Sequence, residues 1–256
     1  MCRFLAYTGR PVLLETLLVE PAVSLVAQSL AAREAKTTVN ADGCGIGWYA
    51  EREEPGLYHG MLPAWSDTNL ASLCRQLRSR MFLAHVRSAT NGEVSLANCH
   101  PFAAGRHLFM HNGQIGNYER VRRRVDALIP DALYAKRRGN GDSEAIFLAA
   151  LGCGLETDPQ GAVTAMLQAV RRIMLDAGIT KPLRFAAIHS DGAVLRCYRW
   201  SSDDCAPTLY WRHTRDGVVV ASEPFDMAAW ETVPPDTVLT ISADDTCRQE
   251  RLMIEG

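Results

Sequence analysis

The sequence predicts an α+β fold in which helices cover two packed antiparallel sheets. Ten short apolar runs have the composition of strands, and the turn residues between them favour antiparallel pairing. Five segments with helical periodicity lie among these runs. Each sheet has to bury an apolar face, and helices on the outer faces of two stacked sheets satisfy that requirement. Other α+β arrangements of the same elements are compatible with this pattern.

The predicted strands are short and spread over the whole chain. Asp191-Gly192 and Asp216-Gly217 are typical hairpin turns, each between two apolar runs. We expect strands at residues 2–7, 45–49, 56–59, 81–86, 107–111, 184–189, 194–200, 208–212, 218–221 and 238–241.

The predicted helices are fewer, and the clearest covers residues 159–177. Its apolar residues recur at helical spacing and form one continuous stripe. Asp158 and Pro159 have the types favoured at the N-cap and first helical position, and Gly178 is a typical helix end. The other helices are expected at residues 22–30, 70–77, 117–128 and 144–151.

Composition indicates an ordinary globular protein, which we expect to form one domain over residues 1–256. The net charge of −2 argues against nucleic acid or an anionic membrane as the main partner. Residues 117–128 contain four arginines, but the helical spacing places them on a solvated face; a partner surface is the alternative. No apolar stretch is long enough to span a bilayer, and no signal segment is recognised. The eight cysteines are scattered without zinc-type spacing, so we expect reduced thiols, no metal, no cofactor and a cytoplasmic location.

Cys2 is the most informative residue of the chain. Removal of Met1 would leave a cysteine that carries both a thiol and a free α-amine. An unperturbed thiol has a pKa of roughly 8.5 and an unperturbed α-amine roughly 7.7–8.0, so the amine can accept the thiol proton near neutral pH. N-terminal residues use this self-activation in covalent catalysis. The alternative is a buried thiol in a strand.

Three polar segments follow predicted strands or open a helix. Arg87 stands where the strand 81–86 ends, and its guanidinium suits a carboxylate, although a surface ion pair is the alternative. Asn112 and Gly113 follow the strand at 107–111 and could form either a tight turn or an oxyanion hole. Asp142 opens the helix at 144–151 and is either an N-cap, a role that Ser143 could also fill, or a partner for a substrate ammonium.

One kind of substrate would use all of these groups. A thiolate at Cys2 attacks an amide carbonyl, while Asn112 and Gly113 hold the oxyanion. Arg87 and Asp142 bind a carboxylate and an ammonium. Glutamine and other γ-glutamyl amides combine an α-carboxylate, an α-ammonium and a side-chain amide. A fourth segment, residues 40–48, is rich in glycine without phosphate-loop spacing, and we expect it to pack closely beside the nucleophile strand.

These motifs, in this order, resemble the class II glutamine amidotransferase domain, whose members are N-terminal nucleophile (Ntn) hydrolases. The resemblance runs from Met-Cys2 through Asn40-Ala41-Asp42-Gly43, Arg87-Ser88-Ala89-Thr90-Asn91-Gly92, His111-Asn112-Gly113 and Gly141-Asp142-Ser143-Glu144 to Ala221-Ser222-Glu223-Pro224. It implies a four-layer αββα sandwich of two antiparallel sheets.

The resemblance also implies a role for each matching residue. Cys2 would be the nucleophile and its α-amine the base. Arg87 would bind the α-carboxylate and Asp142 the α-ammonium, while Thr90 would line the same pocket. Asn112 and Gly113 would form the oxyanion hole. One position departs from larger family members, which have an arginine shortly before the Asp-containing glycine segment, where this chain has Val39.

The length of the chain bears on which activity of the family we expect. The larger amidotransferases carry a synthase domain that consumes ammonia, and this chain has no length for one. It resembles instead the short stand-alone branch of YafJ-like proteins and γ-glutamyl amidohydrolases of the ergothioneine and glutathione pathways. Asn98-Cys99-His100-Pro101-Phe102 is similar to a segment of those members. We therefore expect hydrolysis of a γ-glutamyl amide through a Cys2 thioester.

Two alternatives stay open. The chain could be a glutaminase subunit that supplies ammonia to a separate synthase, or a non-catalytic γ-glutamyl-binding subunit of a complex with a partner such as a peptidase. A remote third option is another N-terminal-cysteine hydrolase, of the bile-salt or penicillin amidase type. The identity of the amine side of the substrate and the oligomeric state, including a homo-oligomer, are not fixed by the sequence.

Overall fold

Two antiparallel sheets form the centre of the protein, in a computed structural model that describes residues 2–34, 38–89 and 92–254. The first sheet has the strand order β11-β9-β10-β1-β4-β2-β3, and the second has the order β13-β12-β8-β7-β6-β5. The strands of the first sheet are β1 (Arg3–Leu13), β2 (Cys44–Tyr49), β3 (Gly56–Gly60), β4 (Arg78–Val86), β9 (Tyr210–His213), β10 (Gly217–Ala221) and β11 (Glu231–Thr232). Those of the second are β5 (Phe102–Ala104), β6 (His107–Gln114), β7 (Arg184–Ser190), β8 (Leu195–Ser201), β12 (Thr237–Ile241) and β13 (Cys247–Arg251).

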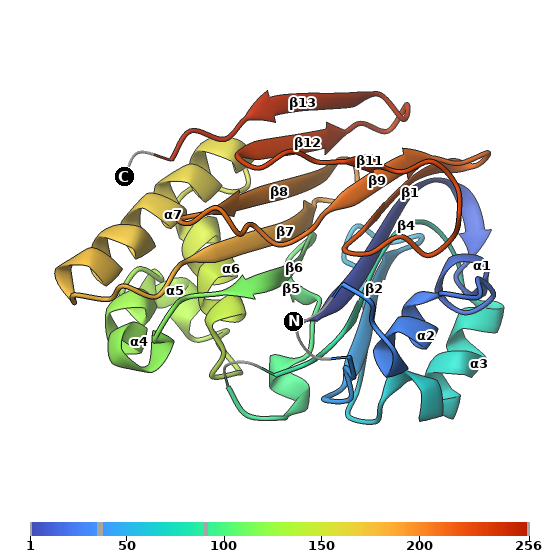
Figure 1. Cartoon of the computed structure of the whole chain (residues 1–256), viewed down its shortest axis with the longest axis horizontal. Coiled ribbons are helices and arrows are strands. Elements are labelled where there is room, and N and C mark those ends of the chain that lie inside the picture. Colours follow the sequence, from blue (N-terminus) through green and yellow to red (C-terminus); the bar gives the residue numbers. More distant parts are fainter. Residues whose placement is uncertain (1, 35–37, 90–91, 255–256) are drawn as a thin grey trace.

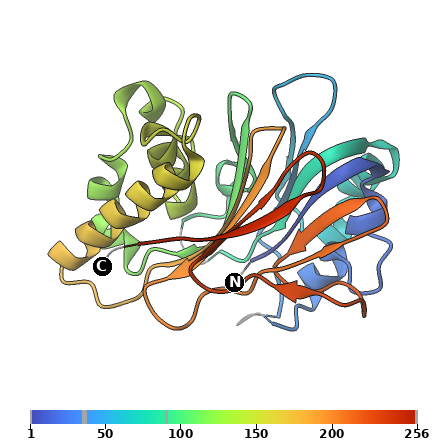
Figure 2. The same cartoon turned by 90° about the horizontal axis from the view of Figure 1, so that it is seen from above.

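Helices cover the outer face of each sheet, which produces four layers. Viewed from above, one group of helices, the two sheets and the other group of helices follow one another across the molecule (Figure 2). On the first sheet lie α1 (Glu15–Leu18), α2 (Leu25–Leu30) and α3 (Thr68–Gln76) (Figure 1). On the second lie α4 (Tyr118–Asp126), α5 (Asp131–Tyr134), α6 (Asp142–Gly152) and α7 (Pro159–Asp176). The expected four-layer αββα sandwich is therefore confirmed.

Three apolar clusters hold the layers together. Between the sheets, side chains such as Phe4, Leu83, Leu108 and Ile188 form one buried core. A second core joins the second sheet to its helices, and a third joins the first sheet to α1, α2 and α3. α6 is buried almost all round because it lies between the sheet and the outer helix α7, which explains why its sequence lacks a polar face.

The predicted elements are all present, with shifted ends. β1 runs six residues past its predicted end at residue 7, and α2 begins at Leu25 because Ser24 caps it by accepting from the backbone N–H of Ala27. Among the α-helices and strands of the described residues, five short ones were not predicted: α1, α5, β5, β11 and β13. Their four, four, three, two and five residues carry too little periodicity to identify.

The register of the first sheet positions the start of the chain. β1 pairs on one side with β10 and on the other with β4, where Arg3 lies opposite Val86. Continuing this antiparallel register by one residue brings Cys2 opposite Arg87. β1 is thus held between two neighbours, and its first residue lies beside the polar end of β4 (Figure 1).

Candidate active site

The Cys2 thiol lies against the backbone that follows β4. Its Sγ accepts from the backbone N–H of Ser88 and faces the Ser88 carbonyl oxygen, both at 3.3 Å. Burial raises the pKa of the thiol, while the Ser88 hydrogen bond and the charges of Arg87 and Arg3 act in the opposite direction. A thiol with a raised pKa is protonated at neutral pH, so its use as a nucleophile requires a nearby base.

The end of β6 supplies the groups opposite the thiol. The Asn112 amide donates to the backbone carbonyl oxygen of Cys2 at 2.9 Å, which links the two sheets at this point. β5 pairs with β6 only from His107 to Phe109. Within the described residues, the edge of β6 at Asn112 and Gly113 therefore has no neighbouring strand on that side, and its polar groups are available to a ligand.

Gly113 is a site of close backbone approach. A Cβ added there would lie 2.0 Å from the carbonyl oxygen of Arg184 on the adjacent strand β7. Only glycine fits without moving one of the two strands. The Asn-Gly pair is not a tight turn, because both residues belong to β6.

Asp142 is the first residue of α6, and its side chain is not the N-cap that the sequence offered as one interpretation. Gly141 occupies the N-cap position instead. One Asp142 carboxylate oxygen accepts from the backbone N–H of Ile115 at 2.9 Å, and the other accepts from the Ser143 hydroxyl at 3.4 Å. Ser143 in turn contacts His111 Nδ1 at 2.9 Å. These contacts fix a carboxylate at the helix N-terminus, where the helix dipole favours negative charge.

Arg87 is held by its backbone and by its side chain. Its N–H donates to Gly43 O at 2.8 Å, and its carbonyl accepts from the N–H of Asp42 at 3.0 Å. Its guanidinium donates to the backbone carbonyl of Glu93 at 2.9 Å. The Asp42 carboxylate also accepts from the N–H of Ala89 at 2.8 Å.

The glycine-rich segment at 40–48 does pack closely, as expected, but its strand neighbour is different. β2 lies beside β4 and not beside β1. A Cβ added at Gly45 would lie 2.2 Å from the carbonyl oxygen of His100. The segment thus supports the strand that carries Arg87.

Four of the predicted site residues line one small cavity: Cys2, Arg87, Gly113 and Asp142. Asn112 does not line this cavity, but its amide is hydrogen-bonded to the backbone carbonyl of Cys2. Thr90 lies outside the described residues. The remaining lining residues are Ser88, Ala89, Asn98, His100, Phe102, His111, Gly141 and Ser143. A nucleophile, a cation and an anion therefore face the same space.

Sequence reasoning assigned no role to two of the lining histidines, His100 and His111. His100 stacks on His85 with ring centroids 4.2 Å apart and meets Phe102 edge-on at 4.5 Å. Burial lowers the pKa of His85 to about 3, lowers that of His100 and lowers that of His111 against the opposing charge of Asp142. The three rings therefore line or underlie the cavity as neutral groups.

An ion pair beside the nucleophile was also missed. Arg3 is completely buried, and its guanidinium lies 3.5 Å from the Glu223 carboxylate. Glu223 also accepts from the backbone N–H groups of Arg33 and Glu34. Ser222 accepts from the N–H of Phe4 at 3.0 Å, so the segment at 221–224 fixes the first residues of β1. In the sequence, this segment was marked only as the last of the ordered motifs that resemble the family.

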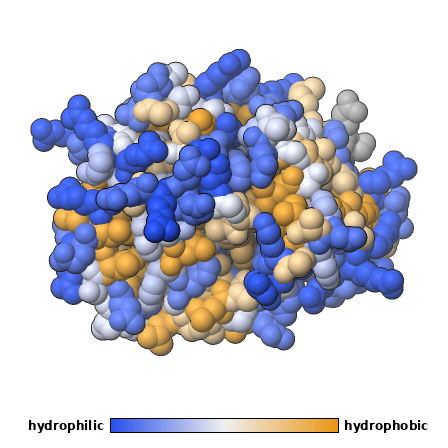
Figure 3. Space-filling view, turned by 180° about the vertical axis from the view of Figure 1, so that it is seen from behind, coloured by the Kyte–Doolittle hydropathy of each residue, from blue (hydrophilic) through white to orange (hydrophobic). Residues whose placement is uncertain are grey.

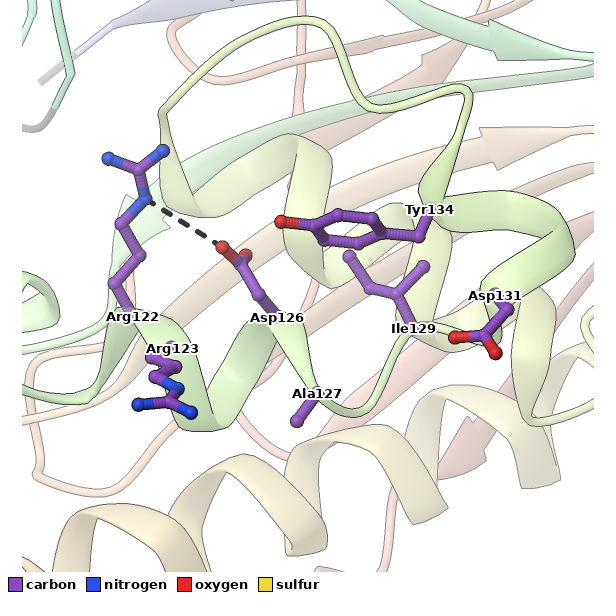
Figure 4. Close-up of a pocket in the computed structure, with 7 residues that line it drawn as sticks. All are labelled: Arg122, Arg123, Asp126, Ala127, Ile129, Asp131 and Tyr134. Atoms are coloured by element: carbon purple, nitrogen blue, oxygen red, sulfur yellow. Dashed lines mark ion pairs between the residues drawn. The ribbon is translucent and has the colours of Figure 1, made fainter.

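A wider hollow lies elsewhere on the surface, between α4 and α5. Its volume is about 550 Å³, and it is lined by Arg122, Arg123, Asp126, Ala127, Ile129, Asp131 and Tyr134 (Figure 4). It contains no nucleophile, and Asp126 already pairs with Arg122 and Arg137. The arginines of α4 are exposed, as predicted.

Three other kinds of feature could indicate a function: hydrophobic surface patches, metal-binding clusters and membrane-spanning helices. On the face opposite to Figure 1, hydrophobic residues form several patches separated by hydrophilic ones (Figure 3). Within residues 2–34, 38–89 and 92–254, no cluster of His, Cys, Asp or Glu is arranged to hold a metal ion. Over the same ranges, no helix has the length and hydropathy needed to cross a membrane. All eight cysteines are free thiols.

Comparison with known families decides the classification. The family model "Glutamine amidotransferases class-II" matches residues 12–204. The chain belongs to the class II glutamine amidotransferase family. The matched segment includes the positions of Arg87, Asn112, Gly113 and Asp142 and begins after Cys2.

Two curated relatives are similar over nearly the whole chain. A probable glutamine amidotransferase, DUG3, of Saccharomyces cerevisiae is 32% identical over 94% of this chain and 82% of its own length. A gamma-glutamyl-hercynylcysteine sulfoxide hydrolase of Mycolicibacterium smegmatis is 32% identical over 91% of this chain and 92% of its own length.

Solved structures agree with the fold. A glutamine aminotransferase class-II domain protein from Silicibacter pomeroyi superposes with a TM-score of 0.79 at 36% identity, covering 98% of this chain and 99% of that protein. Glutamine phosphoribosylpyrophosphate amidotransferase from B. subtilis superposes with a TM-score of 0.70 at 15% identity, covering all of this chain and half of that one. At 15% identity, the second likeness concerns the fold alone.

Proposed function

We propose that this protein hydrolyses γ-glutamyl amides through a thioester on Cys2. The observation that carries the proposal is the convergence of Cys2, Arg87 and Asp142 on one cavity. An amino acid with a free α-carboxylate and a free α-ammonium offers one partner to each charged anchor. Its side-chain amide is then the group left for the thiol.

Each residue has a distinct part in the proposed reaction. Once Met1 is removed, the α-amine of Cys2 accepts the thiol proton, and the thiolate attacks the γ-carbonyl carbon. The Asn112 amide and the Gly113 backbone N–H stabilise the tetrahedral oxyanion. An oxyanion-hole donor of this kind contributes about 3–4 kcal/mol. Asn112 already bonds the Cys2 carbonyl through one amide hydrogen, and its NH₂ group has a second.

The covalent steps then proceed in order. The C–N bond of the amide breaks, and the amine leaves with the proton that the Cys2 amine held. A water molecule gives a proton to the same amine and attacks the thioester carbonyl. The C–S bond then breaks, the departing Cys2 thiolate takes that proton back from the amine, and glutamate is released. Burial raises the pKa of the Cys2 thiol, so an adjacent base is required to form the thiolate at neutral pH, and this mechanism assigns that part to the α-amine.

The relatives support a γ-glutamyl substrate. Gamma-glutamyl-hercynylcysteine sulfoxide hydrolases from two mycobacterial genera are 30–32% identical over 91% of this chain. Their names place the scissile bond at a γ-glutamyl group. We propose the same bond class for this chain, in a cytoplasmic protein with reduced thiols.

Glutamate release is the direct test. The Met-processed protein is incubated with glutamine, glutathione and other γ-glutamyl amines, and free glutamate is measured. Cys2→Ala is expected to abolish release, whereas Cys153→Ala, at an exposed free thiol, should leave it unchanged. Turnover that survives Cys2→Ala would refute the mechanism.

A second candidate function follows from the similarity to a probable glutamine amidotransferase. In that case glutamine would be the preferred substrate, and a separate synthase would accelerate ammonia release. Preference for a substituted γ-glutamyl amine over glutamine, with no stimulation by added partner protein, would exclude the ammonia-supplying role. Glutamate release by the isolated chain would likewise exclude a purely binding role.

A further inference from the structure

Asn98 joins the two segments that carry the charged anchors. It is the last residue of a short 3₁₀ turn at Leu96–Asn98 and is almost fully buried. Its Oδ1 accepts from the backbone N–H of Asn140 at 3.0 Å and of Gly141 at 3.1 Å. Its Nδ2 donates to Asn140 Oδ1 at 2.7 Å and to the Glu93 carbonyl at 2.8 Å. All four directions of hydrogen bonding from one amide are used.

The bonds of Asn98 reach residues that contact one anchor or shortly precede the other. The Glu93 carbonyl that accepts from Asn98 also accepts from the Arg87 guanidinium at 2.9 Å. Gly141 is the N-cap of α6 and directly precedes Asp142. Asn140 completes the hydrogen-bond network, because its Oδ1 also accepts from the N–H of Glu93 at 3.0 Å.

Two glycines permit this close packing. A Cβ at Gly139 would lie 2.2 Å from Asn98 Oδ1, and a Cβ at Gly92 would lie 2.8 Å from Asn140 Oδ1. Gly92 also has φ +78°, a conformation that L side chains rarely adopt. The backbone on both sides of the Asn98–Asn140 pair is thus shaped to admit the two amides.

The substrate explains why such a link would be required. The α-carboxylate and α-ammonium of a glutamyl group are attached to one carbon, so their partners must keep a fixed separation. Arg87 follows β4 of the first sheet, whereas Asp142 begins α6, which covers the second sheet. The two residues are more than fifty positions apart in the sequence. A reacting geometry that is wrong by 1 Å can reduce the rate by about 100-fold.

We propose that Asn98 is a positioning residue that holds the Arg87 and Asp142 anchors at the spacing of one glutamyl α-carbon. The inference rests on the proposed function and adds a residue that does not need to contact the substrate's reacting atoms. It also assigns a role to the Asn98–Phe102 segment, whose first residue links the anchors and whose third and fifth residues line the cavity.

A matched pair of variants separates the hydrogen bonds from the added charge. Asn98→Asp keeps the two accepted bonds but removes both donated bonds to Glu93 and Asn140. Asn140→Asp keeps both bonds that the Asn140 side chain accepts, because that side chain acts only through its oxygen in these contacts. Both variants add one negative charge, on neighbouring side chains whose amide groups lie 2.7 Å apart, and both preserve the shape of the side chain.

The first readout is kcat/KM for a γ-glutamyl amide. We expect a fall of at least about 30-fold for Asn98→Asp and less than about threefold for Asn140→Asp. Alkylation of Cys2 by iodoacetamide, which needs neither anchor, should stay within twofold of wild type in both. Equal losses in the two variants, or an unaffected Asn98→Asp, would overturn the proposal.

The second readout is specific to positioning. Glutaric acid monoamide has the carboxylate and the amide of glutamine but lacks the ammonium. Wild type should prefer glutamine strongly, and Asn98→Asp should lose most of that preference because its two anchors no longer act together. If Asn98→Asp retains the wild-type preference for glutamine over glutaric acid monoamide, Asn98 stabilises the local structure without positioning the anchors.

The third readout does not depend on turnover. Hydrogen exchange at the Glu93 backbone, measured without substrate, should be faster in Asn98→Asp and unchanged in Asn140→Asp. If wild type releases no glutamate from any γ-glutamyl compound, the proposed function fails while this measurement still decides whether Asn98 links the segments. Unchanged exchange in Asn98→Asp would refute the link itself.

Discussion

Asp142→Asn isolates the charge that we assign to recognition of the α-ammonium. The substitution preserves the shape of a side chain that is 5% exposed. In the wild-type chain the Asp142 carboxylate accepts from the N–H of Ile115 at 2.9 Å. An asparagine oxygen can accept the same bond, so the junction between β6 and α6 should persist. What disappears is the charge, and with it one charge-assisted hydrogen bond to a bound ammonium. The amide nitrogen takes the place of the oxygen that accepts from Ser143, whose hydroxyl can act as the acceptor instead.

The magnitude follows from that single bond. A hydrogen bond to a charged group contributes about 1.5–3 kcal/mol, and 1.4 kcal/mol corresponds to a tenfold change. We therefore expect kcat/KM for a γ-glutamyl amide to fall by about 10- to 150-fold. Loss of a negative charge from the first turn of α6 should lower the free energy of unfolding by no more than about 1 kcal/mol.

The assay compares two substrates and two variants. Glutamate release from glutamine is set against turnover of glutaric acid monoamide, which has no ammonium and should be almost insensitive to Asp142→Asn. Asp158→Asn is the matched control, because Asp158 caps α7 by accepting from the N–H of Gly161 and asparagine caps equally well. If Asp142→Asn slows both substrates equally, or leaves glutamine turnover within twofold, the ammonium assignment is wrong.

Three further predictions concern stability and geometry. Glu223→Gln leaves the buried Arg3 charge without its counter-ion and should lower the free energy of unfolding by about 3–5 kcal/mol in urea titrations; a loss below 1 kcal/mol would contradict the role of the pair. Gly113→Ala should cost about 1–3 kcal/mol of stability and most of the glutamate release, because its Cβ would meet the Arg184 carbonyl at 2.0 Å; a fully active variant would be incompatible with this packing. Burial lowers the pKa of His85 to about 3 in the folded state, whereas an exposed histidine has a pKa of about 6.5, so below pH 6.5 the unfolded chain binds more protons than the folded one. The free energy of unfolding should therefore fall by up to about 1.4 kcal/mol per pH unit for each such histidine as the pH drops from 6.5 to 5. A free energy of unfolding that stays constant over this range would refute the burial argument.

The fold was predictable because hydrophobic alternation and turn residues are local signals. The strand at 184–189 and the helix at 159–177 were placed within one residue of the observed β7 and α7. The edge strand β13 was missed because all five of its residues are exposed or half-buried, so no apolar pattern marks it. β1 proved longer because its second half, through Leu13, continues to pair with β4 after an irregularity between Thr8 and Val12.

The candidate site residues were predicted from their places at the start of the chain, after a strand or at the start of a helix. Arg87 follows β4 as predicted, and the register of β1 against β4 brings Cys2 beside it. Asn112 was expected just after the strand at 107–111 but lies inside β6. Asn98 has no such position, and the role that we propose for it depends on contacts with Glu93 and Asn140 that cannot be recognised from the sequence. The Arg3–Glu223 pair joins residues 220 positions apart for the same reason.

The identity of the acylated atom tests the central claim most directly. Purified protein is mixed with a γ-glutamyl amide, quenched in acid within the first turnover and digested, and the N-terminal peptide is analysed by mass spectrometry. We predict a peptide that begins at Cys2 and carries one γ-glutamyl group as a thioester, which hydroxylamine removes. An active enzyme whose N-terminal peptide retains Met1, or whose γ-glutamyl group lies on another residue, would contradict the account.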